Sequence, residues 1–376
     1  MNKVKILHCA DLHFDTPFSE LSRNKSESRK EDLRETFGTI IELVKKEKVG
    51  ILFISGDLFD NKRVMQTTLD YIHKKFLEIS DTKIFLCPGN HDFYDHKSFY
   101  HTMKWPSNVY IFHEKISKVN LAELNTCVYG VGFSKSYERK SLIENFCVDD
   151  ESYINMMVLH GQVVQKGQKS DYNPITIEDI GRSRLDYLAL GHTHKYTGIE
   201  SVENTFFAYS GCPEGRGFDE LGEKGVLIGE LGKGYCHLRF QETSKRKYFV
   251  KKIDISETRT YEEIIRKIND QIENSYKKTH LYKIHLIGEI SEKFSIRTDL
   301  IEQKLKEEFY FIKIIDDTQM ILDYDALEKE FSLKGIFIRN MREKMYQACD
   351  EQEKKRLLKA LKFGIKALEG EGIDLL

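Results

Sequence analysis

Proline is scarce in this chain, with 5 in 376 residues against a usual share of ~5%, which argues against a disordered or low-complexity protein. The 7 cysteines are scattered, with no Cys-x-x-Cys pair, so a disulfide scaffold and a zinc knuckle are disfavoured and a reducing cytosol is favoured. No stretch approaches the ~18 consecutive apolar residues of a membrane span. The apolar start, Val4–Leu7, is too short for a signal peptide, so we expect a cytoplasmic protein without membrane segments.

An excess of charge of one sign is also missing. Lys and Arg number 58 and Asp and Glu number 60, which leaves a formal net charge of −2. A protein that coats nucleic acid by bulk charge is usually far more basic, so any nucleic-acid contact must be local. The phosphate-binding pattern Gly-x-x-x-x-Gly-Lys-Ser/Thr does not occur either, so this chain is not itself a P-loop ATPase.

Apolar residues are plentiful, at 40% of the chain, and the length suggests two or three domains. In the first two thirds of the chain, short apolar runs alternate with amphipathic stretches, which predicts an α/β fold. Those runs that are apolar throughout suit strands that are covered on both faces. The predicted strands are Val4–Ala10, Ile51–Ser55, Ile84–Cys87, Thr126–Phe133, Met156–Leu159, Tyr187–Leu190 and Phe206–Ser210, with helices at Glu31–Lys46 and Thr67–Ile79.

The pattern changes after a predicted hairpin of Val226–Leu231 and Cys236–Phe240. A polar, basic linker, Thr243–Lys247, precedes alternating strands and helices (helices at Tyr261–Tyr276 and Arg297–Glu308), and from Asp325 onward the pattern is helical. Leu358, Leu361, Ile365 and Leu368 form a heptad-like stripe that either docks a partner or covers the chain's own core. The predicted domains are residues 1–242, an α/β core, 243–322, a small α+β unit, and 323–376, C-terminal helices.

Metal-type side chains follow five of the predicted strands directly. In open α/β sheets ligands bind at the carboxyl ends of the strands, so we expect these segments to meet at one edge of one sheet. Carboxylate, amide oxygen and imidazole together suit Mn²⁺, Fe²⁺ or Zn²⁺. Seven ligands suit two ions, which can clamp a phosphate, and Asp57 is the candidate bridge between them. The expected ligands are Asp11, His13, Asp57, Asn90, His160, His192 and His194.

Each motif has an ordinary structural alternative when taken alone. Asp11-x-His13 is a common polar pair after a strand, Gly56-Asp57 is a common turn, and His160 alone could be a core histidine. Gly89-Asn90-His91-Asp92 and Gly191-His192-x-His194 are more specific. The whole set, in this order and each behind a strand, favours a metal centre.

The order of these motifs resembles that of the calcineurin-like metallophosphoesterases over residues 4–212. The resemblance implies a two-sheet sandwich flanked by helices, and hydrolysis of a phosphoester by direct attack of metal-bound hydroxide. It also implies that His91 stabilises the phosphate and protonates the leaving oxygen, with Asp92 orienting His91. One metal would be held by Asp11, His13, Asp57 and His194, and the other by Asp57, Asn90, His160 and His192.

Finer features are similar to the SbcD-type DNA repair exonucleases and their bacterial YhaO subgroup. They include Leu7–Asp15, Leu185–Lys195, Tyr172-x-Pro174, Tyr209-Ser210-Gly211 and Glu214-Gly215-Arg216 with Glu220. The resemblance implies a Mn²⁺-dependent DNA exonuclease or endonuclease, with 243–322 as a DNA-capping domain. It further implies a homodimer and C-terminal helices that dock on a coiled-coil ABC ATPase of the SbcC/YhaN type.

Two positions leave alternatives open. Asp60 stands where eukaryotic and archaeal relatives carry a substrate-orienting histidine, which leaves the balance of exonuclease and endonuclease activity open. Arg216 could grip a phosphate or pair with Glu214 or Asp219. Lys245-Arg246-Lys247 could contact a DNA backbone or form a solvated face. The rival functions are a phosphomonoesterase or small-molecule phosphodiesterase on the same centre, and a scaffold that holds an ATPase at DNA.

Overall fold

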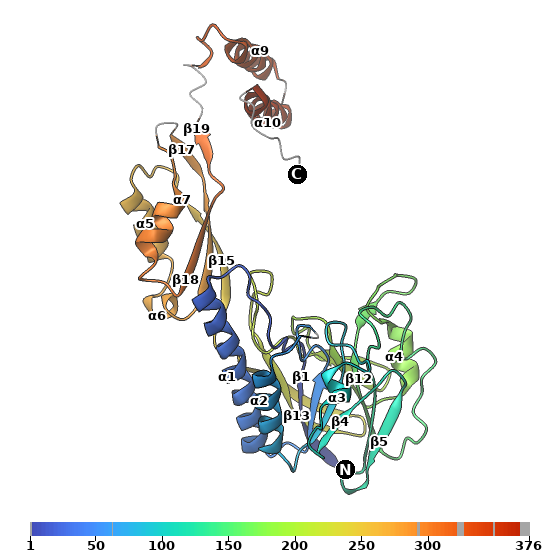
Figure 1. Cartoon of the computed structure of the whole chain (residues 1–376). Helices are drawn as coiled ribbons and strands as arrows, with labels where there is room; N and C mark the ends of the chain where they lie inside the picture. Colours follow the sequence, from blue (N-terminus) through green and yellow to red (C-terminus); the bar gives the residue numbers. More distant parts are fainter. Residues whose placement is uncertain (1, 62, 292–293, 322–326, 349, 369–376) are drawn as a thin grey trace. The chain divides into compact units, whose positions relative to one another are not determined.

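The computed structural model describes residues 2–61, 63–291, 294–321, 327–348 and 350–368 (Figure 1). The chain forms two compact units. The first comprises Met1–Val250, Asn274–Lys283 and Glu308–Ile312, and the second comprises Lys251–Glu273, Ile284–Glu307 and Lys313–Leu376. The predicted division into three domains stays a prediction.

The first unit contains two six-stranded sheets. In the first sheet β1, β2, β3 and β4 are parallel, and β13 and β14 are antiparallel at the other side of β1. The strand order is β14 (Tyr235–Glu242), β13 (Gly225–Gly232), β1 (Lys3–Cys9), β2 (Ile51–Ser55), β3 (Lys83–Cys87) and β4 (Val109–Ile111).

The second sheet has four parallel central strands and antiparallel strands at both edges. Its inner face packs on the first sheet in one apolar cluster, in which Ile6 and Phe53 of the first sheet join Met156, Val158 and Ala189 of the second. The order is β11 (Glu200–Val202), β12 (Thr205–Tyr209), β10 (Tyr187–Gly191), β7 (Ile154–His160), β6 (Thr126–Val131) and β5 (Ser117–Leu121).

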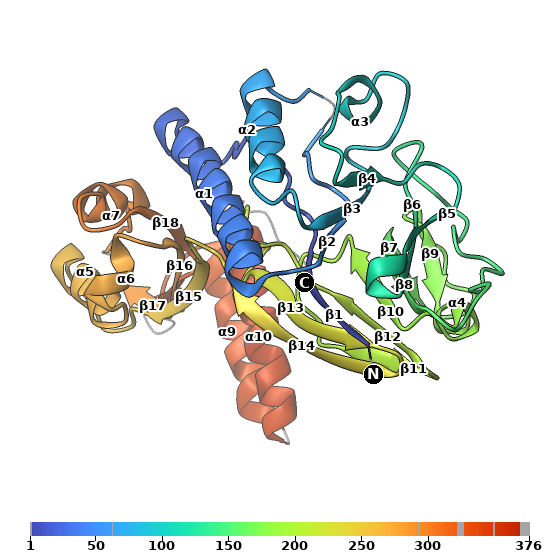
Figure 2. The ribbon, with the colours of Figure 1, turned by 90° about the horizontal axis from the view of Figure 1, so that it is seen from below.

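Helices cover the outer faces of this sandwich. Helices α1 (Arg23–Glu47) and α2 (Gln66–Leu77) lie side by side on the first sheet, as Figures 1 and 2 both show. Their apolar faces share a cluster with the outward side chains of β1 and β2. Helix α4 (Ile177–Ser183) covers the second sheet through Ile180. Helix α3 (Phe99–Thr102) and the short parallel pair β8 (Gln162–Val164) and β9 (Pro174–Thr176) complete the loops. The predicted two-sheet α/β sandwich is confirmed.

Beyond the sandwich the chain forms a three-stranded sheet of β15 (Tyr248–Asp254), β16 (Leu281–Ile287) and β18 (Phe311–Asp316). Helices α5 (Tyr261–Asp270), α6 (Asn274–Lys277) and α7 (Thr298–Leu305) and a pair of β17 (Glu289–Ser291) and β19 (Gln319–Ile321) accompany it. Helices α9 (Leu333–Gln347) and α10 (Glu351–Leu368) pack on each other. Within the described residues, no helix is both long and apolar enough to cross a membrane.

Three elements differ from the sequence expectation. Helix α1 begins at Arg23 rather than at Glu31, because its first turns are polar and carry no apolar period. The helix expected over Tyr261–Tyr276 is divided into α5 and α6. The edge strand β5 was missed because its sequence, Ser-Lys-Val-Asn-Leu, is half polar. The expected start of the tail at Asp325 lies outside the described residues.

Candidate metal centre

The five motif segments meet where strands of both sheets end. Strands β1, β2 and β3 deliver Asp11, Asp57 and Asn90 from the first sheet, while β7 and β10 deliver His160 and His192 from the second. The expectation of one edge of one sheet is therefore corrected to the facing edges of two sheets. Parallel strands carry their loops at the same end, so a sandwich of two parallel cores brings two sets of loops together.

The strand ends approach each other so closely that only glycine fits at two positions. A Cβ on Gly191 would lie 1.7 Å from the backbone oxygen of Ser55, and one on Gly89 would lie 2.2 Å from Oδ1 of Asp57. Asp11, His13 and Asp57 themselves have φ of 54°, 48° and 47°. This left-handed backbone is costly for side-chain residues and is typical of functional sites.

Asp57 lies at the middle of the cluster. Its Oδ2 is 3.6 Å from Nε2 of His13 and 3.5 Å from Nε2 of His160. Burial by itself would raise the pKa of Asp57, but the nearby His160 and His13 outweigh it and lower the pKa to about 2. An ionised carboxylate between two imidazoles is the arrangement that a bridging ligand requires.

The remaining expected ligands surround Asp57. Nε2 of His13 and Nε2 of His194 face each other at 3.3 Å, and Oδ1 of Asn90 is 3.0 Å from Nε2 of His160. Three groups bring their ligand atoms within 4.8 Å of one another: Asp11, His13 and His194; Asp11, Asp57 and His160; and His13, Asp60 and His91.

His192 is placed less directly. Its backbone N–H donates to the Asp11 carboxylate at 3.1 Å, and its ring centroid is 5.3 Å from that of His160. Burial, followed by the neighbouring His160, lowers the pKa of His192 to about 4. Burial also lowers the pKa of His13. Both imidazoles are therefore neutral at pH 7, the form in which histidine binds a metal.

The hydrogen bonds made by Nδ1 of His160 and of His194 show that these residues fit a metal pair. Nδ1 of His160 donates to the Ser55 carbonyl at 2.9 Å, and Nδ1 of His194 is 2.7 Å from Oε1 of Glu220. A proton on Nδ1 leaves the lone pair of Nε2 directed at the other ligands, which is the usual orientation of a metal-binding histidine. The mixed oxygen and nitrogen donors suit Mn²⁺, Fe²⁺ or Zn²⁺.

His91 lies at the exposed rim of the cluster. Its backbone N–H donates to Oδ1 of Asp57 at 3.0 Å, and its ring packs edge-on to His13 at a centroid distance of 4.8 Å. Nδ1 of His91 is 3.0 Å from the backbone oxygen of Asp60, so this nitrogen carries a proton and Nε2 is the one available to a substrate.

Asp92 does not have the expected contact with His91. Its buried carboxylate accepts hydrogen bonds from the N–H groups of Phe59 and Gly89 and from the hydroxyl of Tyr100. Burial, followed by the charge of Asp57, raises the pKa of Asp92 to about 6. Asp92 thus ties together the loops after β2 and β3, and the Asp60 carbonyl is the group that orients the ring of His91.

Arg216 pairs with neither of the acids considered from the sequence. Its Nε is 3.1 Å from Oε1 of Glu220, and its Nη1 is 3.1 Å from Oδ1 of Asp60. Asp60 in turn lies 3.3 Å from Nδ1 of His13. Glu214 instead pairs with the buried Arg29. Asp60 and Arg216 therefore sit behind the histidines.

Two residues of the site were missed by the sequence reasoning. Glu220 appeared there only as part of a subgroup pattern. His8, which was assigned no role, is fully buried under the cluster, with Nδ1 2.9 Å from the Tyr187 hydroxyl and Nε2 3.1 Å from Oγ of Ser55. No local signal marks either residue, because each acts across strands that are distant in sequence.

The basic linker is largely neutralised within the first unit. Lys245 and Arg246 form ion pairs with the buried Asp32, and Lys247 pairs with Glu242. The guanidinium of Arg246 also lies 3.7 Å from the ring centroid of Tyr310. These side chains hold the start of β15 in place, which favours the structural alternative over DNA contact.

Comparison with known proteins identifies the family. The profile of the calcineurin-like phosphoesterases matches residues 4–196, and the chain belongs to this family. It is 25% identical over 289 residues to the uncharacterized metallophosphoesterase YhaO of Bacillus subtilis, covering 74% of this chain and 70% of that one. It is 26% identical to the DNA double-strand break repair protein Mre11 of Methanosarcina acetivorans, over 72% of this chain and 44% of that one. The Mre11 of Saccharolobus solfataricus is 23% identical over 96% of this chain and 94% of that one.

These findings confirm the resemblance to metallophosphoesterases of the YhaO type. Membership of the family makes the chain a metal-dependent phosphoesterase, that is, a hydrolase. The fold, the family and the clustered ligand atoms agree on where its chemistry takes place.

Proposed function

We propose that this protein is a two-metal, Mn²⁺-dependent DNA nuclease that hydrolyses phosphodiester bonds at DNA ends during DNA repair in the cytoplasm. The observation that carries the proposal is the convergence of the ligand set on Asp57, with His91 beside it at the exposed rim. The similarity to DNA double-strand break repair proteins supports DNA as the substrate.

In this proposal Asp11, His13, Asp57 and His194 hold one ion, and Asp57, Asn90, His160 and His192 hold the other. Two such ions, when bound, supply Lewis acidity to the phosphate and lower the pKa of a water. With a proton on both ring nitrogens, His91 contacts the scissile phosphate and gives the Nε2 proton to the leaving oxygen, while its Nδ1–H stays hydrogen-bonded to the Asp60 carbonyl. Asp92 supports the loop that carries His91.

The parts beyond the sandwich have proposed partners as well. We assign residues 243–322 as a DNA-capping domain, 323–376 as the docking segment for a coiled-coil ABC ATPase of the SbcC/YhaN type, and the whole chain to a homodimer. The exposed apolar side chains of the C-terminal helices support the docking role.

The test is release of nucleotides from a 3′-labelled linear duplex by the full chain with Mn²⁺ or with EDTA. We expect release with Mn²⁺ alone, and a loss of at least 100-fold in His91→Ala, since a general acid contributes about 10²–10⁴-fold. His91→Ala should still bind two ions, whereas Asp57→Asn should lose both metal affinity and activity. His96→Ala, an exposed histidine outside the cluster, is the matched control and should remain active.

Two outcomes would contradict this function. Wild-type activity in His91→Ala would remove the proposed proton donor. Turnover of p-nitrophenyl phosphate far faster than of DNA would instead favour a phosphomonoesterase or small-molecule phosphodiesterase on the same centre.

A further inference from the structure

His194 is held from several directions by the loop Cys212–Lys224, which lies between β12 and β13. Oε1 of Glu220 accepts a hydrogen bond from Nδ1 of His194 at 2.7 Å. Nζ of Lys224 donates to the backbone oxygen of His194 at 2.8 Å, and the N–H of Cys212 donates to the same oxygen at 3.3 Å. Glu220 is 8% exposed and Lys224 is 2% exposed. Buried charges of this kind are costly unless they are paired, so the loop is built around these contacts.

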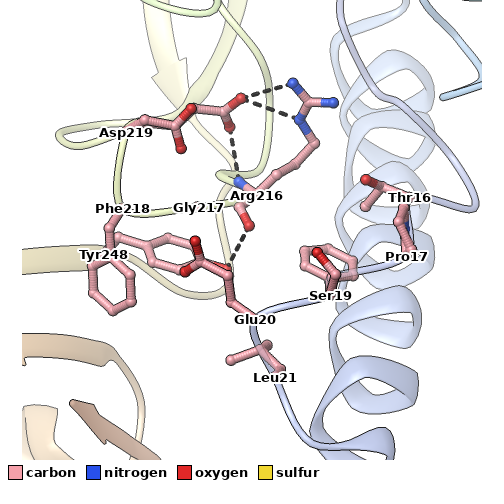
Figure 3. Close-up of a pocket in the computed structure, with 12 residues that line it drawn as sticks. Thr16, Pro17, Ser19, Glu20, Leu21, Arg216, Gly217, Phe218, Asp219 and Tyr248 are labelled. Carbon is pink, nitrogen blue, oxygen red and sulfur yellow. Dashed lines mark hydrogen bonds and ion pairs between the residues drawn. The ribbon is translucent and has the colours of Figure 1, made fainter.

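Arg216 connects Glu220 to a second carboxylate. Its backbone N–H, Nε and Nη2 all donate to Glu220, at 2.8, 3.1 and 2.9 Å. Figure 3 shows Arg216 with its hydrogen bonds and ion pairs as dashed lines. Its Nη1 reaches Asp60, which lies 3.3 Å from Nδ1 of His13. The hydroxyl of Tyr248 anchors the backbone oxygen of Arg216 at 3.0 Å, beside a cavity of about 230 Å³.

This arrangement is confined to one half of the cluster. His13 and His194, whose Nε2 atoms are 3.3 Å apart, are each backed by a carboxylate, and one guanidinium joins the two carboxylates. His160 is backed by the neutral carbonyl of Ser55 instead. The two proposed metal positions therefore receive different support, charged on one side and neutral on the other.

We propose that Glu220, held in place by Arg216, is a positioning residue that sets the affinity of the metal position at His13 and His194 and leaves the position at His160 unchanged. The inference rests on the ligand assignment of the proposed function and deepens it. A carboxylate bonded to Nδ1–H fixes the tautomer of a metal-binding histidine and raises the basicity of Nε2, and losing such a partner typically costs 10- to 100-fold in metal affinity.

The test is calorimetric titration of the metal-free full chain with Mn²⁺ in the absence of DNA, with the electron paramagnetic resonance spectrum of bound Mn²⁺ as a second readout. Wild type should bind two ions. In Glu220→Ala one of the two dissociation constants should rise 10- to 100-fold, with the other unchanged and the spectrum of one ion altered. Glu220→Gln keeps an acceptor for Nδ1–H and should show a smaller loss. Asp219→Asn, the exposed neighbour, should match wild type.

A double-mutant cycle separates positioning from general destabilisation. If Glu220 acts through His194, adding Glu220→Ala to His194→Ala should cause no further loss of affinity. Additive losses, equal weakening of both positions, or two unchanged dissociation constants in Glu220→Ala would each overturn the inference. Should Glu220→Ala fail to fold, Glu220→Gln and Arg216→Lys carry the same comparison, since Lys cannot hold both carboxylates.

The binding experiment keeps the two proposals apart. A chain that binds two ions but does not cleave DNA contradicts the nuclease and leaves this inference standing. If the wild-type chain cleaves DNA but Glu220→Ala leaves both metal affinities unchanged, this inference is contradicted and the nuclease stands.

Discussion

Asp57 has a different task at each of its carboxylate oxygens. Oδ1 accepts the backbone N–H of His91, and Oδ2 lies between the Nε2 atoms of His13 and His160. The same side chain thus fixes the proposed proton donor and the proposed metal bridge relative to each other. The backbone of Asp57 is left-handed, with φ of 47°, and such strain persists only where the surrounding structure holds the residue in place.

His8 supports the centre from below. Its Nε2 lies 3.1 Å from Oγ of Ser55 and 3.2 Å from the backbone oxygen of Leu190, and it is completely buried. The backbone oxygen of Ser55 in turn accepts the Nδ1–H of His160. Burial lowers the pKa of His8 to about 3, so the imidazole is neutral in the folded protein near pH 7.

This depressed pKa predicts an acid-sensitive stability. The unfolded chain binds more protons than the folded chain between a pKa of about 3 and the unfolded value of about 6.5, so stability is full above pH 6.5 and falls as the pH is lowered. Relative to His8→Gln, wild type should lose about 2 kcal/mol more free energy of unfolding between pH 7 and pH 5. Urea unfolding at the two pH values measures it. His96→Gln is the control, and an equal loss in wild type and His8→Gln would contradict the prediction.

At the residue scale, the sequence allowed the cluster to be predicted but not its support. Asp11, Asp57, Asn90 and His160 stand directly after apolar runs, and a strand end is a local feature that a sequence displays. Glu220 and His8 act through hydrogen bonds to residues 26 and 47 or more positions away. Asp92 follows His91 directly in the sequence. Its carboxylate nevertheless accepts the backbone N–H groups of Phe59 and Gly89, because buried N–H groups require an acceptor.

At the scale of elements, the centre depends on how closely the end of β10 approaches the end of β2. The missing side chain of Gly191 makes room for the backbone oxygen of Ser55, with which a Cβ would clash at 1.7 Å. Backbone atoms move out of the way of an added side chain less easily than other side chains do. A substitution here must therefore move one sheet relative to the other at the point where the ligands converge.

Gly191→Ala should accordingly destabilise the protein by at least the 1–3 kcal/mol typical of overpacking and weaken Mn²⁺ binding. Gly38→Ala is the matched control. Gly38 lies within α1, and a Cβ there would sit 3.4 Å from the hydroxyl of Tyr71, so this change should stabilise by about 0.5–1 kcal/mol. Thermal unfolding and Mn²⁺ titration of both variants measure these effects. Wild-type stability and affinity in Gly191→Ala would show that the strand ends are less tightly packed than the structure implies.

Elements were predicted well where burial is two-sided. The largely apolar β2, β7 and β10 are buried along their whole length and lie where the sequence predicted them. Half-polar β5 and three-residue β4 were missed, because edge strands need fewer apolar residues and pairing with a neighbour decides them. The start of α1 was missed for the related reason that its first turns carry few buried apolar residues.

At the scale of the whole molecule, the C-terminal helices combine a small core with exposed apolar side chains. Ile338 and Met341 of α9 pack with Leu361 and Ile365 of α10. The predicted apolar stripe on α10 is therefore divided, since Leu361 and Ile365 are buried while Leu358 and Leu368 are exposed. Around this core, Phe331, Leu333, Ile336 and Tyr346 are exposed, Phe331 and Tyr346 almost fully. Large apolar side chains exposed in this number are typical of interaction sites.

If this surface docks the coiled-coil ATPase, its removal should separate partner binding from catalysis. Because every proposed metal ligand lies between Asp11 and His194, a chain ending at residue 326 should keep Mn²⁺ binding and nuclease activity and should no longer co-elute with the ATPase. Replacing Phe331, Leu333 and Ile336 by Ser should weaken the complex by at least 10-fold, since burying each such side chain contributes about 1.5–3 kcal/mol. Leu77→Ser, an exposed apolar residue of α2, is the control. Wild-type affinity in the triple variant would place the ATPase elsewhere on the molecule.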